Sequence, residues 1–371
     1  MPNYNESVTY TEILQQTNKW RALQGILSAG MPRFREFLEP LLSNPKLRIV
    51  LTGAGTSAFV GEIAAPALQG STKRRVEQVP TTTIVSNPRE VFAEDVPVLL
   101  VSFARSGNSP ESVAATHLAD QVAQDVHHLI ITCAEDGQLA VDHRDRSESL
   151  VVIMPEGSND KGFAMTSSFS CMLLSVLVLL GGYDVDLLPR LADTADEMVE
   201  RRHDQIEALA QKLPERVVYL GSGPLHGLAH EASLKFLELT AGDHLAFFES
   251  SLGFRHGPKA VIDDQTQVFV FVSSDAYTRQ YDLDIIKELR GNIGVDAVLA
   301  LSATDVELEN AWVLDDLQDV PDAFVAVVHV MVAQLMGVFT SAALGKTIDN
   351  PFPAGDVNRV VKGVIIHGLP Q

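Results

Sequence analysis

The sequence predicts an α/β protein in which two parallel sheets, each flanked by helices, follow one another along the chain. Short apolar runs without polar alternation recur between amphipathic segments, and strands of this kind are buried on both faces, as in a parallel sheet. The runs come in two sets at a nearly constant offset, so that Ile49–Thr52 and Val217–Leu220 each lead into a glycine-containing turn. A chain of 371 residues is long enough for two such domains.

Residues 1–45 predict a peripheral helical segment. Apolar side chains recur at roughly helical spacing between Thr11 and Leu27, and a shorter apolar stripe runs from Phe34 to Leu41. Asn44-Pro45 ends this segment before the first strand.

Both sets of strands and helices can be placed along the chain. For the first sheet we expect strands near 48–52, 79–85, 98–103, 128–132 and 150–154, with helices near 57–69, 109–124 and 165–182. A charged helical stretch, Leu187–Leu213, joins the two halves. The second set has apolar strands near 217–220, 268–273, 297–301 and 311–314, with helices near 225–241, 277–291 and 321–344. The tail from Lys346 to Gln371 is expected to be irregular.

Composition excludes several classes of partner. The chain has 28 Lys and Arg against 48 Asp and Glu, a formal net charge of −20, which excludes nucleic acid and anionic membranes. The spacing of Cys133 and Cys171 suits neither a metal site nor a disulfide scaffold, so we expect a cytoplasmic protein. The polar N-terminus lacks a signal-peptide core, and the apolar run Cys171–Gly182 is too short to span a bilayer.

The turn after the first strand is a candidate phosphate loop. Gly53–Ser57 opens a helix, and the N–H groups at a helix N-terminus attract an anion. The turn lacks the third glycine of a dinucleotide fingerprint and the lysine of a Walker loop, so a generic glycine turn is the alternative.

A second candidate loop follows the third strand. Ser102–Glu111 packs hydroxyls, a glycine and a helix start into ten residues, and Ser106 and Ser109 can donate to phosphate oxygens. The alternative is a serine-rich turn that caps the helix. The second copy continues instead as Ser274-Asp275-Ala276-Tyr277, so we expect a phosphate to bind the first copy alone.

Together these loops resemble the SIS (sugar isomerase) family of phosphosugar-binding domains, and the duplication resembles the tandem arrangement in glucosamine-6-phosphate synthase. The resemblance covers roughly residues 45–363, and the strongest match is His230–Glu238 followed by Gly253–Lys259. Within the family the sequence is most similar to the galactosamine-6-phosphate deaminase/isomerase branch, also called tagatose-6-phosphate ketose/aldose isomerases. Pro155–Asp160 and Ala164–Phe169 support that branch.

The resemblance implies a domain plan. Two tandem SIS domains, each a flavodoxin-like three-layer unit with a parallel sheet flanked by helices, would span residues 46–190 and 191–345. An N-terminal helical segment (1–45) would precede them, and a C-terminal tail (346–371) with an active-site lysine would follow. The implied substrate-binding residues are Gly55, Thr56, Ser57, Arg105, Ser106, Gly107, Asn108, Ser109 and Ser167.

Two departures from the synthase matter. The chain has no N-terminal nucleophilic cysteine and no glutaminase domain, which argues against glutamine-driven amination. Ala104 stands where the synthase has a serine in its phosphate loop, which leaves Ser106 and Ser109 as the hydroxyls of that loop.

One helix carries candidate acid–base residues. An aldose–ketose shift needs a base that carries a proton between C2 and C1. Glu231, Lys235 and Glu238 lie at i, i+4 and i+7 on one face of the helix. An ammonium beside a carboxylate can adjust the acid–base properties of that carboxylate. An ordinary charged face with i,i+4 pairing is the alternative. The resemblance implies Glu238 as the base, supported by Glu231 and Lys235.

The resemblance implies two further catalytic residues. His256 would shuttle a proton between O5 and O1 during ring opening, a role that suits an imidazole side chain. In the synthase the matching histidine comes from a neighbouring subunit, so a homodimer or higher homo-oligomer with shared active sites is implied. Lys362 matches the synthase's C-terminal lysine and would stabilise the developing oxyanion.

Two polar clusters leave alternatives open. His226 and His230 lie at i and i+4 and form either a metal pair or packed, hydrogen-bonded histidines, and we prefer the latter and expect no metal. The loop Asn159-Asp160-Lys161 either meets the substrate or caps a helix.

The expected function is that of a deaminating isomerase in amino sugar catabolism. It would convert galactosamine-6-phosphate to tagatose-6-phosphate and ammonia, as a hydrolase acting on C–N bonds coupled to an intramolecular oxidoreductase. Side chains and water suffice for this chemistry, so no cofactor is expected. The alternatives are a glucosamine-6-phosphate deaminase, an isomerase of non-amino sugar phosphates, and a non-catalytic sugar-phosphate sensor. The joint presence of Glu238, His256 and Lys362 favours catalysis over sensing.

Overall fold

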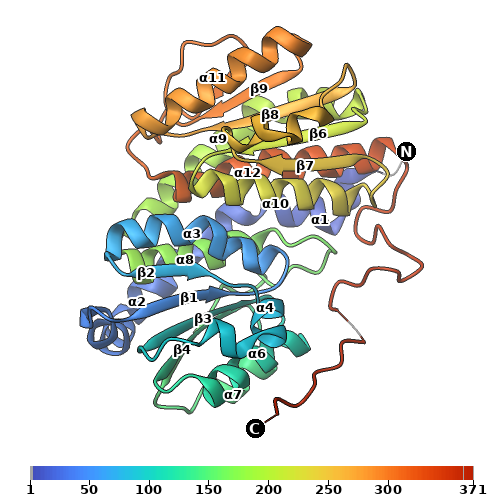
Figure 1. Cartoon of the computed structure of the whole chain (residues 1–371). Coiled ribbons are helices and arrows are strands. Elements are labelled where there is room, and N and C mark those ends of the chain that lie inside the picture. The colour runs from blue at the N-terminus through green and yellow to red at the C-terminus, as the bar shows by residue number, and fades with distance from the viewer. Residues whose placement is uncertain (1–2, 362, 371) are drawn as a thin grey trace. The chain divides into compact units, whose positions relative to one another are not determined.

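The computed structural model describes residues 3–361 and 363–370 and contains two five-stranded sheets (Figure 1). Each sheet is the core of one compact unit. The first-sheet unit comprises residues 18–160, 167–188 and the described residues after 354. The second-sheet unit comprises residues 3–17, 161–166 and 189–354. The domain boundaries predicted from the sequence remain a proposal.

In the first-sheet unit all strand pairs are parallel, and the strand order is β2-β1-β3-β4-β5. After the long helix α2 (Gln16–Ser43), the elements are β1 (Arg48–Thr52), α3 (Thr56–Thr72), β2 (Arg75–Gln78), α4 (Thr81–Ser86), α5 (Pro88–Val91), β3 (Val98–Ala104), α6 (Pro110–Val122), β4 (Val126–Thr132), α7 (Gln138–His143), β5 (Ser149–Ile153) and α8 (Ser167–Gly181).

The second-sheet unit repeats this topology, with the strand order β7-β6-β8-β9-β10 and parallel pairs throughout. Its elements are η1 (Tyr4–Glu6), α1 (Val8–Leu14), α9 (Leu187–Gln211), β6 (Arg216–Gly221), α10 (Pro224–Leu239), β7 (Leu245–Glu249), η2 (Gly253–His256), η3 (Pro258–Val261), β8 (Thr266–Val272), α11 (Ala276–Ile293), β9 (Val298–Ser302), β10 (Ala311–Val313) and α12 (Asp322–Ala343).

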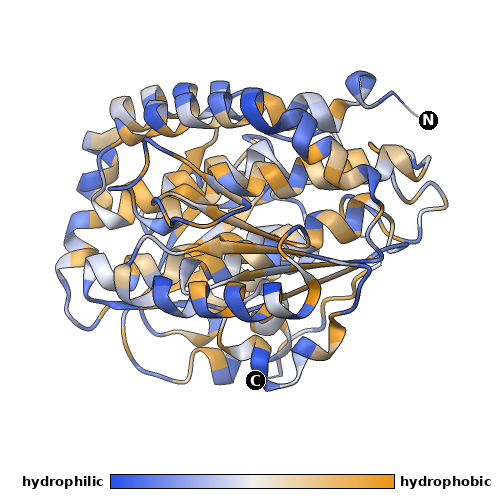
Figure 2. Cartoon of the chain, turned by 90° about the horizontal axis from the view of Figure 1, so that it is seen from above, coloured by the Kyte–Doolittle hydropathy of each residue, from blue (hydrophilic) through white to orange (hydrophobic). Residues whose placement is uncertain are grey.

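The central strands confirm the prediction from hydropathy. Every residue of β1, β3 and β8 is buried, because helices cover both faces of each sheet. Figure 2 shows hydrophobic strands beside helices whose turns alternate between hydrophilic and hydrophobic. In each unit the second and third strands lie on opposite sides of the first: β2 and β3 flank β1, and β7 and β8 flank β6. The strand order therefore reverses between β1 and β3 and between β6 and β8, and each of these places is a switch point.

One predicted strand is wrong. Residues 79–85 are rich in Thr, Ile and Val, which favour strands, yet the edge strand β2 is formed earlier by Arg75–Gln78. Residues 81–86 instead form α4, which begins after Pro80 and buries Ile84 in the core. The Thr81 N–H donates to the Gly53 carbonyl at 2.8 Å, so this segment turns back over the first loop instead of joining the sheet.

Two other elements differ from the sequence-based expectations. The first N-terminal stripe begins in α1 and continues into α2, and the second stripe lies in α2 as well, which contains Pro32 and Pro40. The edge strand β7 was not predicted, because its side chains are mostly half-buried and carry no alternation signal. The helix α12 is long and apolar enough to cross a membrane, but all of its apolar window is buried inside the protein, as in a core helix.

Candidate functional site

The loop after β1 is built for a close backbone approach. A side chain on Gly53 would place Cβ 2.5 Å from the backbone of Ser57, so this position requires glycine. Gly55 precedes α3 with φ of 55°, a conformation that favours glycine. Among the described residues no side chain caps this helix, whose first residues are Thr56 and Ser57. Two N–H groups of its first turn donate to loop carbonyls at 3.2 and 2.8 Å, so the helix suits an anion through the positive end of its dipole.

The loop after β3 is held rigidly against the start of α7. Gly107 has φ of 67°, and its carbonyl accepts a hydrogen bond from the Leu139 N–H at 3.0 Å. A Cβ on Gly137 would lie 2.3 Å from the carbonyl oxygen of Ser106. Both glycines therefore set the path of this loop, and Gly137 is a residue that the sequence reasoning missed.

The polar side chains of this loop lie near the surface. Ser106 and Ser109 are half-buried, and Asn108 is exposed. The Ser106 hydroxyl accepts from the Asn108 N–H at 3.3 Å, and the Ser109 hydroxyl donates to Ser112 at 2.6 Å. Asn108 Oδ1 accepts from the Gln138 N–H at 2.9 Å, which ties the loop to α7. The two serine hydroxyls thus have local partners and reach the loop surface.

The two loops lie at the same edge of the sheet. Thr52 and Ser102, near the carboxyl ends of β1 and β3, are register neighbours in parallel strands. The structure therefore brings Gly55–Ser57 and Arg105–Ser109 together at the switch point of the first sheet. Ligands of open parallel sheets bind at such points.

Two guanidinium groups accompany the loops. Arg105 is buried, with 8% of its surface exposed, and donates to the carbonyl of Arg359 at 2.8 Å. Arg359 in turn donates to the carbonyl of Asp160. In a chain with a net charge of −20, these groups supply local positive charge beside the loops after β1 and β3. Arg359 was not predicted as a site residue because it belongs to a tail without periodicity.

Ser167 is the first residue of α8 and is fully buried. Its N–H donates to Asp160 Oδ1 at 3.0 Å, while the N–H and hydroxyl of Ser168 donate to Asp160 Oδ2 at 2.9 and 2.5 Å. This confirms the helix-capping alternative for Asp160. A contact between Ser167 and a substrate remains a prediction.

The predicted acid–base residues of α10 form one cluster in the second-sheet unit. The Lys235 ammonium contacts the Glu238 carboxylate and lies 3.7 Å from Glu231 Oε1. The side chains of Glu231 and Lys235 are 0% and 1% exposed, whereas that of Glu238 is 22% exposed. Only Glu238 of the three therefore reaches the surface of its unit, with a buried ammonium behind it.

Close helix packing fixes this cluster. At the C-terminal end of α10, a Cβ on Gly337 of α12 would lie 2.8 Å from Leu239 Cδ1 and 3.4 Å from the Lys235 carbonyl oxygen. Glycine at this position lets the two helices approach closely. The backbone that carries Lys235 and Glu238 is held in place as a result.

His256 ends the short helix η2, in the turn that follows β7. Phe254 is fully buried in the core of the second sheet and anchors this turn, while His256 itself is exposed. In the described part of the chain, no hydrogen bond or ion pair joins His256 to the α10 cluster. The structure therefore does not bring His256 into contact with these residues within its unit.

The last predicted catalytic residue, Lys362, lies outside the described residues. Its role remains a prediction.

Comparison with known proteins identifies the family. The SIS domain matches residues 41–181. The AgaS protein of Streptomyces coelicolor is 53% identical over 97% of this chain and 95% of its own length. A D-galactosamine-6-phosphate deaminase AgaS of Escherichia coli is 44% identical, with the same two coverages. This chain belongs to the AgaS family of SIS-domain proteins.

A solved structure agrees with the AgaS assignment. The tagatose-6-phosphate ketose/aldose isomerase of Escherichia coli superposes with a TM-score of 0.90 at 40% identity, covering 99% of this chain and 98% of that protein.

In this AgaS-family chain the second switch point contains an internal carboxylate. Gly223 precedes α10 with φ of 57° and ψ of −126°, close to the 55° and −131° of Gly55 before α3. Asp282 of α11 is fully buried there and accepts hydrogen bonds from the hydroxyls of Ser222 and Ser251. That a phosphate binds the first copy alone remains a prediction.

In this AgaS-family chain, His230 packs against an aromatic neighbour and His226 lies near an acidic one. His230 stacks on Phe248 with ring centroids 3.8 Å apart, and His226 Nε2 lies 3.8 Å from Glu249 Oε1. Of the two alternatives left open by the sequence, this stacking favours a packed histidine at His230.

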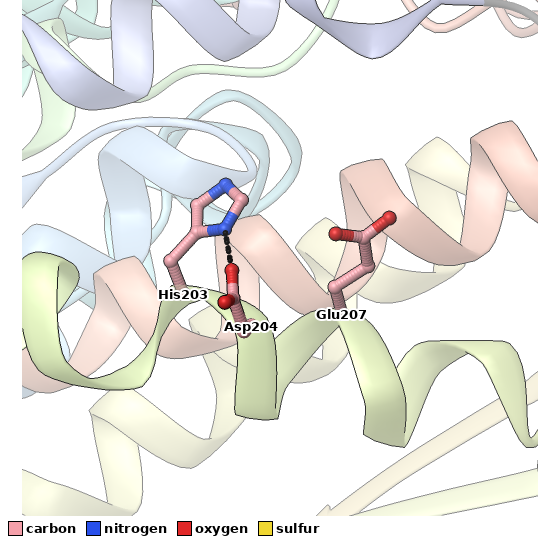
Figure 3. Close-up of side chains that lie close together, drawn as sticks. All are labelled: His203, Asp204 and Glu207. Carbon is pink, nitrogen blue, oxygen red and sulfur yellow. Dashed lines mark hydrogen bonds and ion pairs between the residues drawn. The ribbon is translucent and has the colours of Figure 1, made fainter.

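Among the described residues, one group offers three metal-ligand atoms within 4.8 Å of one another, and Figure 3 shows it on α9: His203, Asp204 and Glu207. His203 is already bonded to Asp204 at 3.1 Å and to the Tyr10 hydroxyl at 2.9 Å, and Glu207 accepts from the Tyr4 hydroxyl at 3.1 Å. These bonds attach the N-terminal segment to α9, which explains the cluster without an ion.

Proposed function

We propose that this protein is a D-galactosamine-6-phosphate deaminase that forms tagatose-6-phosphate and ammonia. The Glu231–Lys235–Glu238 cluster carries the proposal, because it supplies acid–base chemistry in a chain that is 40–53% identical to AgaS proteins over nearly its whole length. In class it would be a hydrolase acting on C–N bonds coupled to an intramolecular oxidoreductase, and it would work in the cytoplasm without a cofactor.

The proposed phosphate site is the pair of loops after β1 and β3. Backbone N–H groups at the start of α3, with the hydroxyls of Ser106 and Ser109, would hold the phosphate oxygens. Arg105 would supply positive charge, which matters because the overall charge of −20 repels an anionic substrate.

Glu238 would move the proton in the open-chain aldehyde. It removes the C2 proton, and the electron pair forms the C1–C2 double bond of an enolamine. Protonation at C1 then gives a C2 imine with a hydroxymethyl group at C1. Water adds to C2, ammonia leaves, and a ketose remains. The Lys235 ammonium would stabilise the negative charge that develops on O1.

Two further roles are part of the proposal. His256 would carry the proton between O5 and O1 when the sugar ring opens, and its exposure suits a residue donated to a neighbouring subunit. Lys362 would stabilise the enolate oxygen. We therefore propose a homodimer or larger homo-oligomer with shared active sites.

We also propose that both units are SIS domains, in tandem. The shared 2-1-3-4-5 strand order and the matching backbone angles of Gly55 and Gly223 support a duplication.

Ammonia release tests this function. Purified protein is given galactosamine-6-phosphate and glucosamine-6-phosphate in parallel, and the ketose product is identified. We expect ammonia and tagatose-6-phosphate from the galacto sugar, with release lost in Glu238→Gln and retained in Glu200→Gln, an exposed control on α9. Release mainly from the gluco sugar would contradict the substrate assignment while keeping the mechanism.

A second candidate is a plain ketose/aldose isomerase. The name of the Escherichia coli structure, at 40% identity, favours it. The same experiment separates the two, because an isomerase interconverts tagatose-6-phosphate and its aldose without releasing ammonia. If the protein binds phosphosugars but catalyses neither reaction, the result would favour a non-catalytic sugar-phosphate sensor.

A further inference from the structure

A buried carboxylate in the second-sheet unit is held entirely by hydrogen-bond donors. Asp282 Oδ1 accepts from the Ser222 hydroxyl at 2.7 Å and from the Ser251 hydroxyl at 2.5 Å. Its Oδ2 accepts from the Ser273 N–H at 3.0 Å. The side chain is fully buried, and among the described residues no lysine or arginine pairs with it. Burial raises the pKa of this carboxyl despite the three donors.

The donors come from three loops at the carboxyl edge of the sheet. Ser222 follows β6, Ser251 follows β7 and Ser273 follows β8. These strands are neighbours in the order β7-β6-β8. Hydroxyl and N–H donors that converge at a switch point, beside a helix N-terminus with positive backbone φ, are the features of an oxyanion site.

The two units differ in the residue at the equivalent position of the helix that follows the third strand. Counted from the first residue of α6 and of α11, Thr116 stands where the second unit has Asp282. Thr116 bonds instead to its own helix, through the Val113 carbonyl at 3.0 Å. The first unit thus carries no carboxylate here, whereas the second unit carries one.

We propose that the second switch point is an oxyanion site whose permanent ligand is the carboxylate of Asp282, and that this ligand positions two segments of the catalytic machinery. Ser222 lies two residues before α10, which carries Glu238, and Ser251 begins the turn that leads to His256. Asp282 bridges these two segments through one oxygen. The positioning part rests on the proposed function, whereas the anion site itself does not.

Chemical rescue tests the anion site independently of any enzyme activity. Asp282→Ala opens a space for a small carboxylate, so its melting temperature should fall by on the order of 5 °C and rise again as sodium formate is added. Sodium chloride at matched ionic strength should not restore it. Wild-type protein in the same series accounts for formate bound elsewhere.

Two matched variants sharpen the test. Asp282→Asn keeps the space filled and should lose stability without rescue by formate. Asp284→Ala removes an exposed carboxylate two residues further along α11 and should change neither the melting temperature nor the response to formate. Equal effects of formate and chloride on Asp282→Ala would overturn the anion site.

The positioning role is read from kinetics on the same variants. Asp282→Ala should lower kcat about tenfold or more, with KM for the sugar phosphate changed much less, and formate should restore kcat. If Asp282→Ala does not fold, Ser251→Ala carries the test, because it frees the His256 turn and should lower kcat in the same way. Stability rescue without a change in kcat in either variant would keep the anion site and overturn the positioning role.

Discussion

Lys235 and Glu231 lie one turn apart on α10, with the ammonium nitrogen 3.7 Å from a carboxylate oxygen and both side chains buried. Removing one partner of a buried ion pair deprives the remaining charge of its attraction to that partner, which is costly. We therefore expect Lys235→Met to lower the free energy of unfolding by about 3 kcal/mol, measured by urea denaturation. The double variant Glu231→Leu with Lys235→Met should recover much of that loss. A single variant as stable as wild type would contradict the charge argument.

The proposed phosphate loop after β3 depends on Gly137, the residue before the first residue of α7. A Cβ there would lie 2.3 Å from the Ser106 carbonyl oxygen, so Gly137→Ala must displace the loop. We expect KM for the sugar phosphate to rise about tenfold or more, with a smaller change in kcat. Steady-state kinetics with galactosamine-6-phosphate measure both.

Gly25→Ala is the matched control for this substitution. Gly25 lies within α2, and a Cβ there meets no atom within 4 Å. The control should leave KM unchanged and stabilise the fold by about 0.5–1 kcal/mol. An equal rise of KM in both variants would show that the loop displacement is not the cause.

Acid should destabilise the first-sheet unit through a buried histidine pair. His143 and His128 are fully buried with ring centroids 4.6 Å apart. Burial, and then the positive neighbours His128, Arg146 and His117 against the opposing Asp120, lower the pKa of His143 to about 3. Burial also lowers the pKa of His128. The His143 ring is therefore neutral in the folded state down to about pH 3, and below the ordinary histidine pKa the unfolded chain binds a proton that the folded protein does not.

The sign of the effect follows. The stability from a neutral His143 is fully present above about pH 6.5 and is lost as the pH falls toward about 3, at up to about 1.4 kcal/mol per pH unit for one proton. We expect His143→Gln to flatten the pH dependence of the free energy of unfolding between about pH 4 and 6.5. An unchanged slope would show that His143 already binds its proton in the folded state.

Features set by local sequence were predictable. The glycine loop after β1 is a single turn, and Glu231, Lys235 and Glu238 lie on a single helix. Their geometry therefore follows from the local sequence pattern. The predicted strand at 79–85 failed because β-propensity competed with the pairing of Arg75–Gln78 to β1, which is a tertiary choice.

The carboxylate of Asp282 could not be predicted in the same way. Its partners Ser222 and Ser251 are 60 and 31 residues away along the chain, and no periodicity connects them. Only the convergence of β6, β7 and β8 brings them together. Gly137 and Arg359 were missed for the same reason, since their contacts come from distant segments.

Shared active sites predict recovery of activity from two inactive variants. If Glu238 of one subunit works with His256 of its neighbour, a mixed dimer of Glu238→Gln and His256→Ala contains one site with both native residues and one with neither. Random exchange of subunits gives such dimers half of the time, so the mixture should regain about a quarter of wild-type activity. Activity is measured after the two variants are unfolded and refolded together, with each variant refolded alone as the control. If both residues act within one subunit, every site in the mixture keeps one defect, and activity stays at the level of the separate variants.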